Sequence, residues 1–297
     1  MTKPERKEGW FRASITQLEE KEEGFKADIA ELERKANWVR REVLEMTVGL
    51  AGAHLAPSFS CTELLVALYH GGILRVDPQN QYWDGRDRFV LSKGQACLAL
   101  YPILADLGFF PVSELRSFCK LGSRLGAHAE SNVPGVEAFT GSLGHGLSIA
   151  AGMALAAKMD GKDYMTVVLL GDGECQEGSV WEAAMFAAQH HLDNLVAIVD
   201  RNYLQAIDFT EKALAIDPLQ QKWESFGWDV RNTDGHSFEC ILPALNDIRS
   251  CHPGRPLAVI ARTTKGKGVS FMENQPIWHY RTPNSAELEQ ARKELAR

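Results

Sequence analysis

Asp172 and Asn202 are the residues of this chain whose types and spacing most directly suggest chemistry. Their carboxylate and amide oxygens are hard ligands of the kind that Mg²⁺ and Ca²⁺ prefer. Asp172 stands between Gly171 and Gly173, and glycines allow a bulky anion to approach the backbone. A metal held by only two side chains usually shares its other positions with ligand phosphate and water. These four residues therefore predict a site for a metal ion and a diphosphate.

The sequence between these residues predicts how they come together. The apolar runs 167–170 and 195–199 are typical of strands buried on both faces, and 179–191 has the apolar spacing of a helix. This crossover places Asp172 and Asn202 just beyond the carboxyl ends of two parallel strands, where open α/β sheets bind ligands. The alternative is a tight turn at Asp172 and a loop cap at Asn202, without a ligand; a bare GDG does not separate the two.

Longer stretches resemble a known family. GDG followed about 30 residues later by Asn is the signature of thiamine-diphosphate enzymes, and GDGECQEGSVWEA with NLVAIVDRN resembles transketolases. Three further blocks agree with that family, namely DRFVLSKGQA at 87–96, GVEAFTGSLGHGLSIAAGMALAAK at 135–158 and KGKGVSFMEN…WH at 265–279. The resemblance runs from about Leu32 to the C-terminus. It implies an α/β fold with an open, mostly parallel sheet and helices on both faces, with thiamine diphosphate and Mg²⁺ (or Ca²⁺ or Mn²⁺) as cofactors.

The resemblance also implies which residues hold the cofactor. The metal shell would consist of the side chains of Asp172 and Asn202 and the backbone carbonyl of Leu204. Glu177 matches a glutamate that relatives place at the subunit interface, where it links the paired cofactors; a simple charge at a helix N-terminus is a compatible interpretation. The residues expected to contact the cofactor itself are Gln95, Gly141, Leu143, Gly171, Gly173, Asn202 and His279.

Three histidines are expected at the reacting centre. The family match assigns catalytic roles to His54, His128 and His279, together with Glu177. A histidine at such a centre can hydrogen-bond a substrate hydroxyl or move a proton. A lone histidine in a turn is otherwise more often structural or merely exposed, so the resemblance carries these assignments.

The chain departs from the family pattern at four positions. Gln95 replaces the histidine of SKGH, His145 replaces a glutamine, Ala206 replaces a larger aliphatic residue, and Tyr280 follows His279. Gln keeps hydrogen bonding but has no proton to exchange near neutral pH. Gln95 therefore indicates either a shifted range of sugars, for instance branched or modified ones, or the exchange of one diphosphate hydrogen bond for another.

Full-length relatives continue with two more domains, and the first of these supplies the glutamate that activates the cofactor. This chain resembles only the first, diphosphate-binding domain. The resemblance therefore implies the N-terminal subunit of a split transketolase, active with a separate C-terminal subunit in an α2β2 assembly. The expected reaction transfers a two-carbon ketol unit from a ketose phosphate to an aldose. The sequence does not name the sugar pair.

Three alternatives remain open at this stage. The chain could be a subunit of another thiamine-diphosphate enzyme, of the 2-oxo acid dehydrogenase or deoxyxylulose-phosphate synthase type, although SKGQA and KGKGVSFMEN favour transketolase. It could be a non-catalytic partner with a degenerate site, which only Gln95, His145 and Ala206 support. It could also be an α/β domain without a cofactor, in which case the spacing of Asp172 and Asn202 would be coincidence.

The first 46 residues predict a long amphipathic helix, or two helices in register. Apolar residues recur every three or four positions from 15 to 46, with one break at Glu22. We expect 1–31 to be a helical extension and 32–297 the domain that binds thiamine diphosphate and Mg²⁺. The helix either packs on its own domain, which we favour, or contacts a partner as a coiled coil.

Composition narrows the class of protein. The net charge of −7 over 297 residues argues against nucleic acid as the main partner. No apolar run approaches the roughly 20 residues of a membrane span, and the charged start MTKPERKEGW has no signal-peptide core. Six cysteines without CxxC spacing indicate reduced thiols. We therefore expect a cytoplasmic protein.

Overall fold

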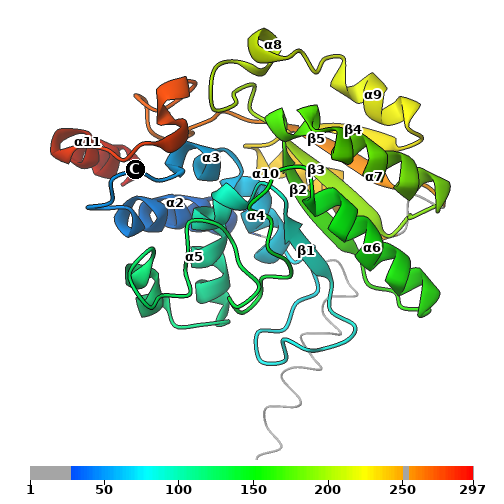
Figure 1. Ribbon diagram of the computed structural model, residues 1–297. Coiled ribbons are helices and arrows are strands. Elements are labelled where there is room, and N and C mark those ends of the chain that lie inside the picture. The colour runs from blue at the N-terminus through cyan, green and yellow to red at the C-terminus, as the bar shows by residue number, and fades with distance from the viewer. Residues whose placement is uncertain (1–27, 250–253, 297) are drawn as a thin grey trace, which may run out of the picture.

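The computed structural model describes residues 28–249 and 254–296, and a parallel sheet lies at its centre (Figure 1). Within these residues the strand order is β1-β2-β3-β5-β4, and every neighbouring pair is parallel. The strands are β1 (Arg88–Leu91), β2 (Thr166–Gly171), β3 (Leu195–Arg201), β4 (Asp229–Asp234) and β5 (Leu257–Arg262). The expected open, parallel α/β sheet is confirmed.

Helices cover both faces of this sheet (Figure 1). One side carries α2 (Ile29–Met46), α3 (Leu55–Ser60), α4 (Thr62–Tyr69), α5 (Cys97–Leu107), α10 (Phe238–Leu245) and α11 (Ser285–Leu295). The other side carries α6 (Gly146–Met159), α7 (Gly178–Gln189) and α9 (Leu219–Ser225). Shorter segments are η1 (Gly94–Ala96), η2 (Val112–Ser117), η3 (Gly173–Gln176), α8 (Thr210–Ala213) and η4 (Pro276–Tyr280). Within the described chain, no helix has both the length and the apolar character needed to span a bilayer.

The strand β3 shows why the apolar runs form central strands. Val196 and Ile198 belong to the hydrophobic core under α2, α4 and α5, whereas Ala197 and Val199 belong to the core under α6 and α7. Since successive side chains of a strand point to opposite faces, a strand covered on both sides is apolar at every position of its covered part, which in β3 is 195–199. The predicted strand–helix–strand crossover is therefore confirmed.

The register of the sheet brings the two expected ligands to one edge. Gly171, the last residue of β2, pairs with Asp200 of β3, and Asp200 pairs in turn with Ala261 of β5. Asp172 and Asn202 therefore leave neighbouring strands at their carboxyl ends. All loops that follow β1, β2, β3 and β5 open toward the same edge.

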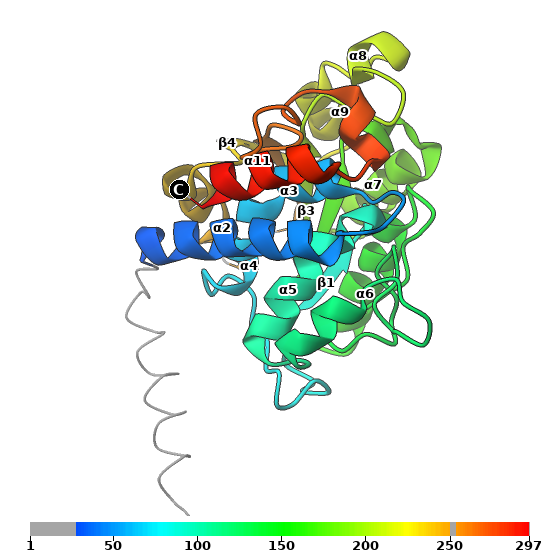
Figure 2. The ribbon, with the colours of Figure 1, turned by 90° about the vertical axis from the view of Figure 1, so that its left-hand side faces the viewer.

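The helix α2 packs on its own domain, as favoured from the sequence. Asp28 caps it by accepting a hydrogen bond from the backbone N–H of Ala30 at 3.0 Å. Figure 2 shows α2 running beside α11. The guanidinium of Arg292 in α11 donates two hydrogen bonds to the carboxylate of Glu45 in α2. Its buried stripe contains Leu32, Ala36, Val39 and Val43. The expected boundary between residues 31 and 32 falls within this continuous helix; the rest of the predicted extension, 1–27, lies outside the described residues.

The connection between α2 and α3 is short, because α2 ends at Met46. The helix α3 already begins at Leu55, directly after His54, and includes Pro57. Proline is tolerated in the first turn of a helix because the N–H groups there have no intrahelical partner. His54 consequently lies at a helix start and not in the middle of a long loop.

Candidate active site

A cavity of about 470 Å³ opens at the carboxyl edge of the sheet. Its wall is made by the loops after β1, β2, β3 and β5, by the start of α3 and by η4. Every site residue expected from the sequence lines it: His54, Gln95, His128, Gly141, Leu143, Gly171, Asp172, Gly173, Glu177, Asn202, Leu204 and His279. Segments more than 200 residues apart therefore meet at one place.

Asp172 lies at the base of this cavity and is 1 % exposed. Its carboxylate accepts hydrogen bonds from the backbone N–H groups of Gly173 at 2.8 Å and Tyr203 at 2.6 Å, and from the Arg201 guanidinium at 3.2 Å. Burial and the negative charge of Asp200 raise its pKa to about 6, against the influence of Arg201. A further positive partner would stabilise the charged form of a carboxylate whose pKa is raised in this way.

Asn202 is held by its neighbours so that its two amide atoms have separate partners. The Nδ2 group donates to the Asp200 carboxylate at 3.1 Å, and Oδ1 accepts from the backbone N–H of Leu204 at 3.1 Å. Asp200 itself is fully buried, and it accepts hydrogen bonds from Lys93, Ser60 and Thr263. Burial opposes its ionisation, but these donors, Lys93 above all, still hold its pKa below the ordinary value.

Lys265 is a cavity residue whose role the sequence did not indicate. The residue is 2 % exposed, and its ammonium donates to the Leu204 carbonyl at 2.9 Å and to His279 Nδ1 at 2.7 Å. Burial and the positive charge of Lys93 lower its pKa to about 7. None of the ion pairs within residues 28–249 and 254–296 includes Lys265. A buried cation without a carboxylate partner is costly unless an anion approaches it.

The glycines beside Asp172 leave space in the cavity for such an anion. A Cβ built at Gly171 would have no non-neighbouring heavy atom nearer than 3.8 Å, so any side chain there would extend into the cavity. A Cβ at Gly173 would lie 3.0 Å from the Cβ of Gln205. The open glycine backbone, the buried amine of Lys265 and the oxygens of Asp172 and Asn202 together fit a diphosphate with a divalent cation.

The three expected histidines lie together in this cavity. The ring of His54 is 5.9 Å from that of His128 and 5.4 Å from that of His279. Burial, followed by neighbouring positive groups, lowers the pKa of His54 to about 4 and that of His279 to about 3. Both rings are therefore neutral at neutral pH. With the Lys265 ammonium as donor, Nδ1 of His279 accepts and its Nε2 carries the hydrogen.

A buried glutamate ties the glycine-rich loops to this edge of the sheet. Glu174 accepts from the backbone N–H groups of Gly144 at 2.9 Å and Gly171 at 3.0 Å, and from the hydroxyl of Ser92. The sequence alone did not indicate this role, because a glutamate two residues after Asp172 looks like an ordinary charge at a helix start. Glu177, which was expected, is exposed at the cavity margin and stands at the N-cap position of α7, where its side chain makes no capping hydrogen bond.

The four departures from the family pattern lie at different places. Gln95 and Ala206 line the cavity, whereas His145 is exposed at the start of α6 and does not. Tyr280 lies against the ring of His54 at 4.7 Å and covers Gly52, where a Cβ would meet its Cε1 atom at 2.6 Å. A side chain at position 52 would therefore require this tyrosine to move.

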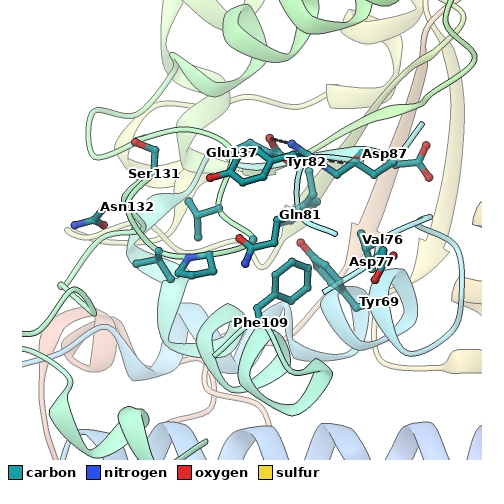
Figure 3. A pocket seen from close by; sticks show the side chains of 16 residues that line it. Tyr69, Val76, Asp77, Gln81, Tyr82, Asp87, Phe109, Ser131, Asn132 and Glu137 are labelled. Carbon is teal, nitrogen blue, oxygen red and sulfur yellow. Dashed lines mark hydrogen bonds and ion pairs between the residues drawn. The ribbon is translucent and has the colours of Figure 1, made fainter. Parts of the chain in front are cut away.

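A second cavity, of about 210 Å³, lies at the amino end of β1 (Figure 3). The Arg86–Glu137 ion pair crosses one wall, and Tyr69, Gln81 and Phe109 lie around it. It contains none of the residues expected to do chemistry. The carboxyl edge is therefore the candidate active site.

Comparisons with known proteins agree with this site. Residues 34–296 match the family model described as transketolase, thiamine diphosphate binding domain. The chain is 43% identical over 257 residues to one of the subunits of the apulose-4-phosphate transketolase of Phocaeicola vulgatus, covering 86% of this chain and 91% of that one. It is 40% identical over 242 residues to 6-deoxy-6-sulfo-D-fructose transketolase subunit SqwG of a Clostridium species, covering 81% and 87%.

Longer transketolases match over a part of their length. Human transketolase is 38% identical over 244 residues, which is 81% of this chain but 38% of the human one. The crystal structure of Campylobacter jejuni transketolase superposes with a TM-score of 0.84 at 30% identity, covering 91% of this chain and 43% of that one. The chain therefore belongs to the transketolase family and corresponds to the thiamine diphosphate-binding domain of these enzymes.

Proposed function

We propose that this chain is the diphosphate-binding subunit of a two-subunit transketolase. The enzyme would transfer a two-carbon ketol unit from a ketose phosphate to an aldose acceptor. The observation that carries this proposal is the cavity at the carboxyl edge of the sheet. A buried lysine, which has no carboxylate partner among the described residues, faces hard oxygen ligands and three histidines there.

In this proposal the loops after β2 and β3 bind the metal, which would be Mg²⁺, Ca²⁺ or Mn²⁺. Asp172, Asn202 and the carbonyl of Leu204 would be its ligands. The carbonyl accepts from Lys265 at present, but its second lone pair is free to bind a metal. Lys265 and the N–H groups around Gly173 would hold the phosphate oxygens. Thiamine diphosphate supplies, when bound, the carbon nucleophile that protein side chains lack.

The histidines would act on the substrate. His54 and His279 are kept neutral by burial, so each can donate one hydrogen bond and accept another. With Nδ1 of His279 occupied by Lys265, its Nε2–H would donate to a sugar oxygen. His128 completes the group, and the three rings would orient the hydroxyls and move protons between them and the reacting carbon.

A partner subunit is the second part of the proposal. The similar apulose-4-phosphate transketolase chains are nearly as long as this one, and each is named as one subunit of its enzyme, which implies another. Apolar side chains are exposed around the cavity, among them Ile207, which is 82 % exposed, with Leu214, Ile277 and Tyr280. We propose that a C-terminal transketolase subunit, with the pyrimidine-binding domain, covers this margin in an α2β2 assembly. Glu177 would lie at that interface.

We further propose that the sugars are not the common pentose phosphates. Gln95 in the cavity wall cannot exchange a proton near neutral pH, and Tyr280 adds an aromatic ring beside His54. Two similar subunits carry the names of enzymes for apulose 4-phosphate and a sulfonated fructose.

A cytoplasmic location fits the free thiols of the cysteines in the described chain.

Reconstitution tests this function. We expect the purified chain to bind thiamine diphosphate in Mg²⁺ but to turn over no ketose phosphate until the C-terminal subunit is added. Titration calorimetry measures the first property, and a coupled assay of aldose release measures the second. Turnover by the highly purified chain alone, or no cofactor binding in the mixture, would contradict the proposal.

A further inference from the structure

His236 lies outside the cavity, at the turn after β4, yet both of its ring nitrogens have fixed partners. Its Nδ1 atom is 3.0 Å from Oε2 of Glu63, and its Nε2 atom is 2.7 Å from the backbone nitrogen of Thr264. Thr264 directly precedes Lys265. A side chain from one turn therefore holds the backbone next to the cavity lysine.

These contacts determine the tautomer of the ring. A backbone N–H can only donate, so Nε2 of His236 must present its lone pair to Thr264. The hydrogen of the neutral imidazole then sits on Nδ1 and is donated to Glu63. The histidine is consequently an acceptor toward the active-site loop and a donor toward the core.

The other end of this contact is anchored in the core. Glu63 is 6 % exposed and accepts from the Arg40 guanidinium at 2.6 Å. Arg40 also donates to the carbonyl of Phe59 at 3.0 Å. Burial favours the neutral acid at Glu63, but Arg40 and His236 together still lower its pKa below the ordinary value. A buried, charged pair thus fixes the position of the ring.

The loop that His236 holds is fixed by backbone hydrogen bonds on both sides of this contact. The carbonyl of Lys265 accepts from the N–H of Asn274 at 2.9 Å, and the carbonyl of Thr264 accepts from the N–H of Lys267 at 3.2 Å. Thr263 is fixed by its N–H to the carbonyl of Arg201 at 3.1 Å, and the N–H of Gly266 donates to Ala56 at 3.1 Å. Between them, the N–H of Thr264 donates to His236. Without this acceptor, the N–H of Thr264 would lose its partner, and the peptide that joins Thr263 to Thr264 would tilt, which would shift Lys265 relative to the Leu204 carbonyl.

We propose that His236 is a positioning residue, which holds the Thr264–Lys265 backbone so that the Lys265 ammonium points into the cavity. The ring does this from outside the cavity, through the chain Arg40–Glu63–His236–Thr264. Its effect on ligand binding rests on the proposed function, in which Lys265 holds the phosphate oxygens. Its effect on the loop does not depend on any ligand.

Two substitutions at this position separate the two contacts. In His236→Gln, the longer amide places an acceptor near the position of Nε2 and restores the bond to Thr264. In His236→Asn, the shorter amide reaches Glu63 but not Thr264. His70→Asn is a matched control, because His70 is 12 % exposed beside Asp106, much as His236 is 13 % exposed beside Glu63, and it lies outside the cavity.

The measurements are hydrogen exchange of the full chain and titration with inorganic pyrophosphate in Mg²⁺. We expect exchange of the peptide around 263–268 to become about tenfold faster in His236→Asn, as suits the loss of one hydrogen bond worth about 1.4 kcal/mol. Pyrophosphate should bind about tenfold more weakly for the same reason. Exchange within β2 should not change, and His236→Gln and His70→Asn should resemble the wild type.

Unchanged exchange at 263–268 in His236→Asn would overturn the inference, as would a uniform rise in exchange across the sheet. Should His236→Asn fail to fold, nitrogen NMR of the wild-type ring still decides the point, because a hydrogen found on Nε2 excludes the acceptor role. A wild-type chain that binds neither pyrophosphate nor thiamine diphosphate would refute the proposed function instead. The exchange comparison would then still test the loop.

Discussion

Replacing Lys265 by methionine separates the proposed role of its charge from its part in the fold. Methionine has a similar length and no charge, so the substitution removes the contacts to Leu204 at 2.9 Å and to His279 at 2.7 Å. A hydrogen bond to a charged group contributes about 1.5–3 kcal/mol. If Lys265 binds a phosphate oxygen, the dissociation constant of thiamine diphosphate should therefore rise about 10- to 150-fold.

The free protein should respond differently. Among the described residues Lys265 is a buried charge without a carboxylate partner, which is costly in the free protein, and methionine removes that cost. We therefore expect an unchanged or higher melting temperature without ligand. Lys222→Met is the matched control, because Lys222 donates to the carbonyl of Ile216 at 2.6 Å outside the cavity. Calorimetric titration and thermal unfolding measure both effects; wild-type affinity in Lys265→Met would refute the reasoning.

Three further predictions concern the metal site, the substrate and the core. Asp172→Asn and Asn202→Ala should each weaken thiamine diphosphate binding in Mg²⁺ at least about 100-fold. Loss of a residue that only hydrogen-bonds a metal ligand already lowers metal affinity or activity about 10–100-fold. A titration that shows wild-type affinity would exclude the metal site. Gln95→His in the reconstituted enzyme should raise turnover of xylulose 5-phosphate with ribose 5-phosphate by about 10²–10⁴-fold; a wild type that is already fast on this pair, and is unchanged by the substitution, would reject the proposed shift of substrate. Glu63→Gln leaves Arg40 buried without its charge partner and should cost about 3–5 kcal/mol at pH 7 by urea unfolding. The pKa of Glu63 is lowered in the folded protein. Its contribution to stability is therefore complete above the unfolded pKa of about 4.3 and is lost as the pH falls through the folded pKa. Equal free energies of unfolding for the wild type and Glu63→Gln at pH 7 would contradict this prediction.

The crossover was predictable from sequence because local pattern and tertiary position agree there. The runs around 167–170 and 195–199 are apolar at every position, as strands covered on both faces must be. Parallel pairing then leaves no freedom in where Asp172 and Asn202 lie. The stripe of α2 was predictable for the same reason, since its buried residues keep a helical spacing.

Lys265 could not be recognised in the same way. Its sequence context, KGKG, lacks the spacing of a phosphate-binding loop, and the lysine faces Leu204 only because β5 lies beside β3. One signal was present in the sequence: the lysine follows the apolar run 257–261, which has the pattern of a further buried parallel strand and would end at the same edge as Asp172. His236 carried no such signal, because its partners Glu63 and Thr264 are distant in sequence.

The charges at the base of the cavity explain why a ligand of mixed sign fits it best. Lys93 is neutralised by Asp200, whereas within the described chain Lys265 has no carboxylate partner. Asp172 has the opposite deficit. Its cationic partner in the described part of the chain, Arg201, also pairs with Glu211 and Asp217.

A simple anion would satisfy the lysine but repel this carboxylate, and a bare cation would do the reverse. A diphosphate carrying a divalent cation meets both needs at once, with the cation toward Asp172 and phosphate oxygens toward Lys265. On this argument neither component should bind well alone. Titrations with Mg²⁺ alone and with pyrophosphate alone should each give much weaker binding than the two together, and strong binding of either by itself would contradict the charge argument.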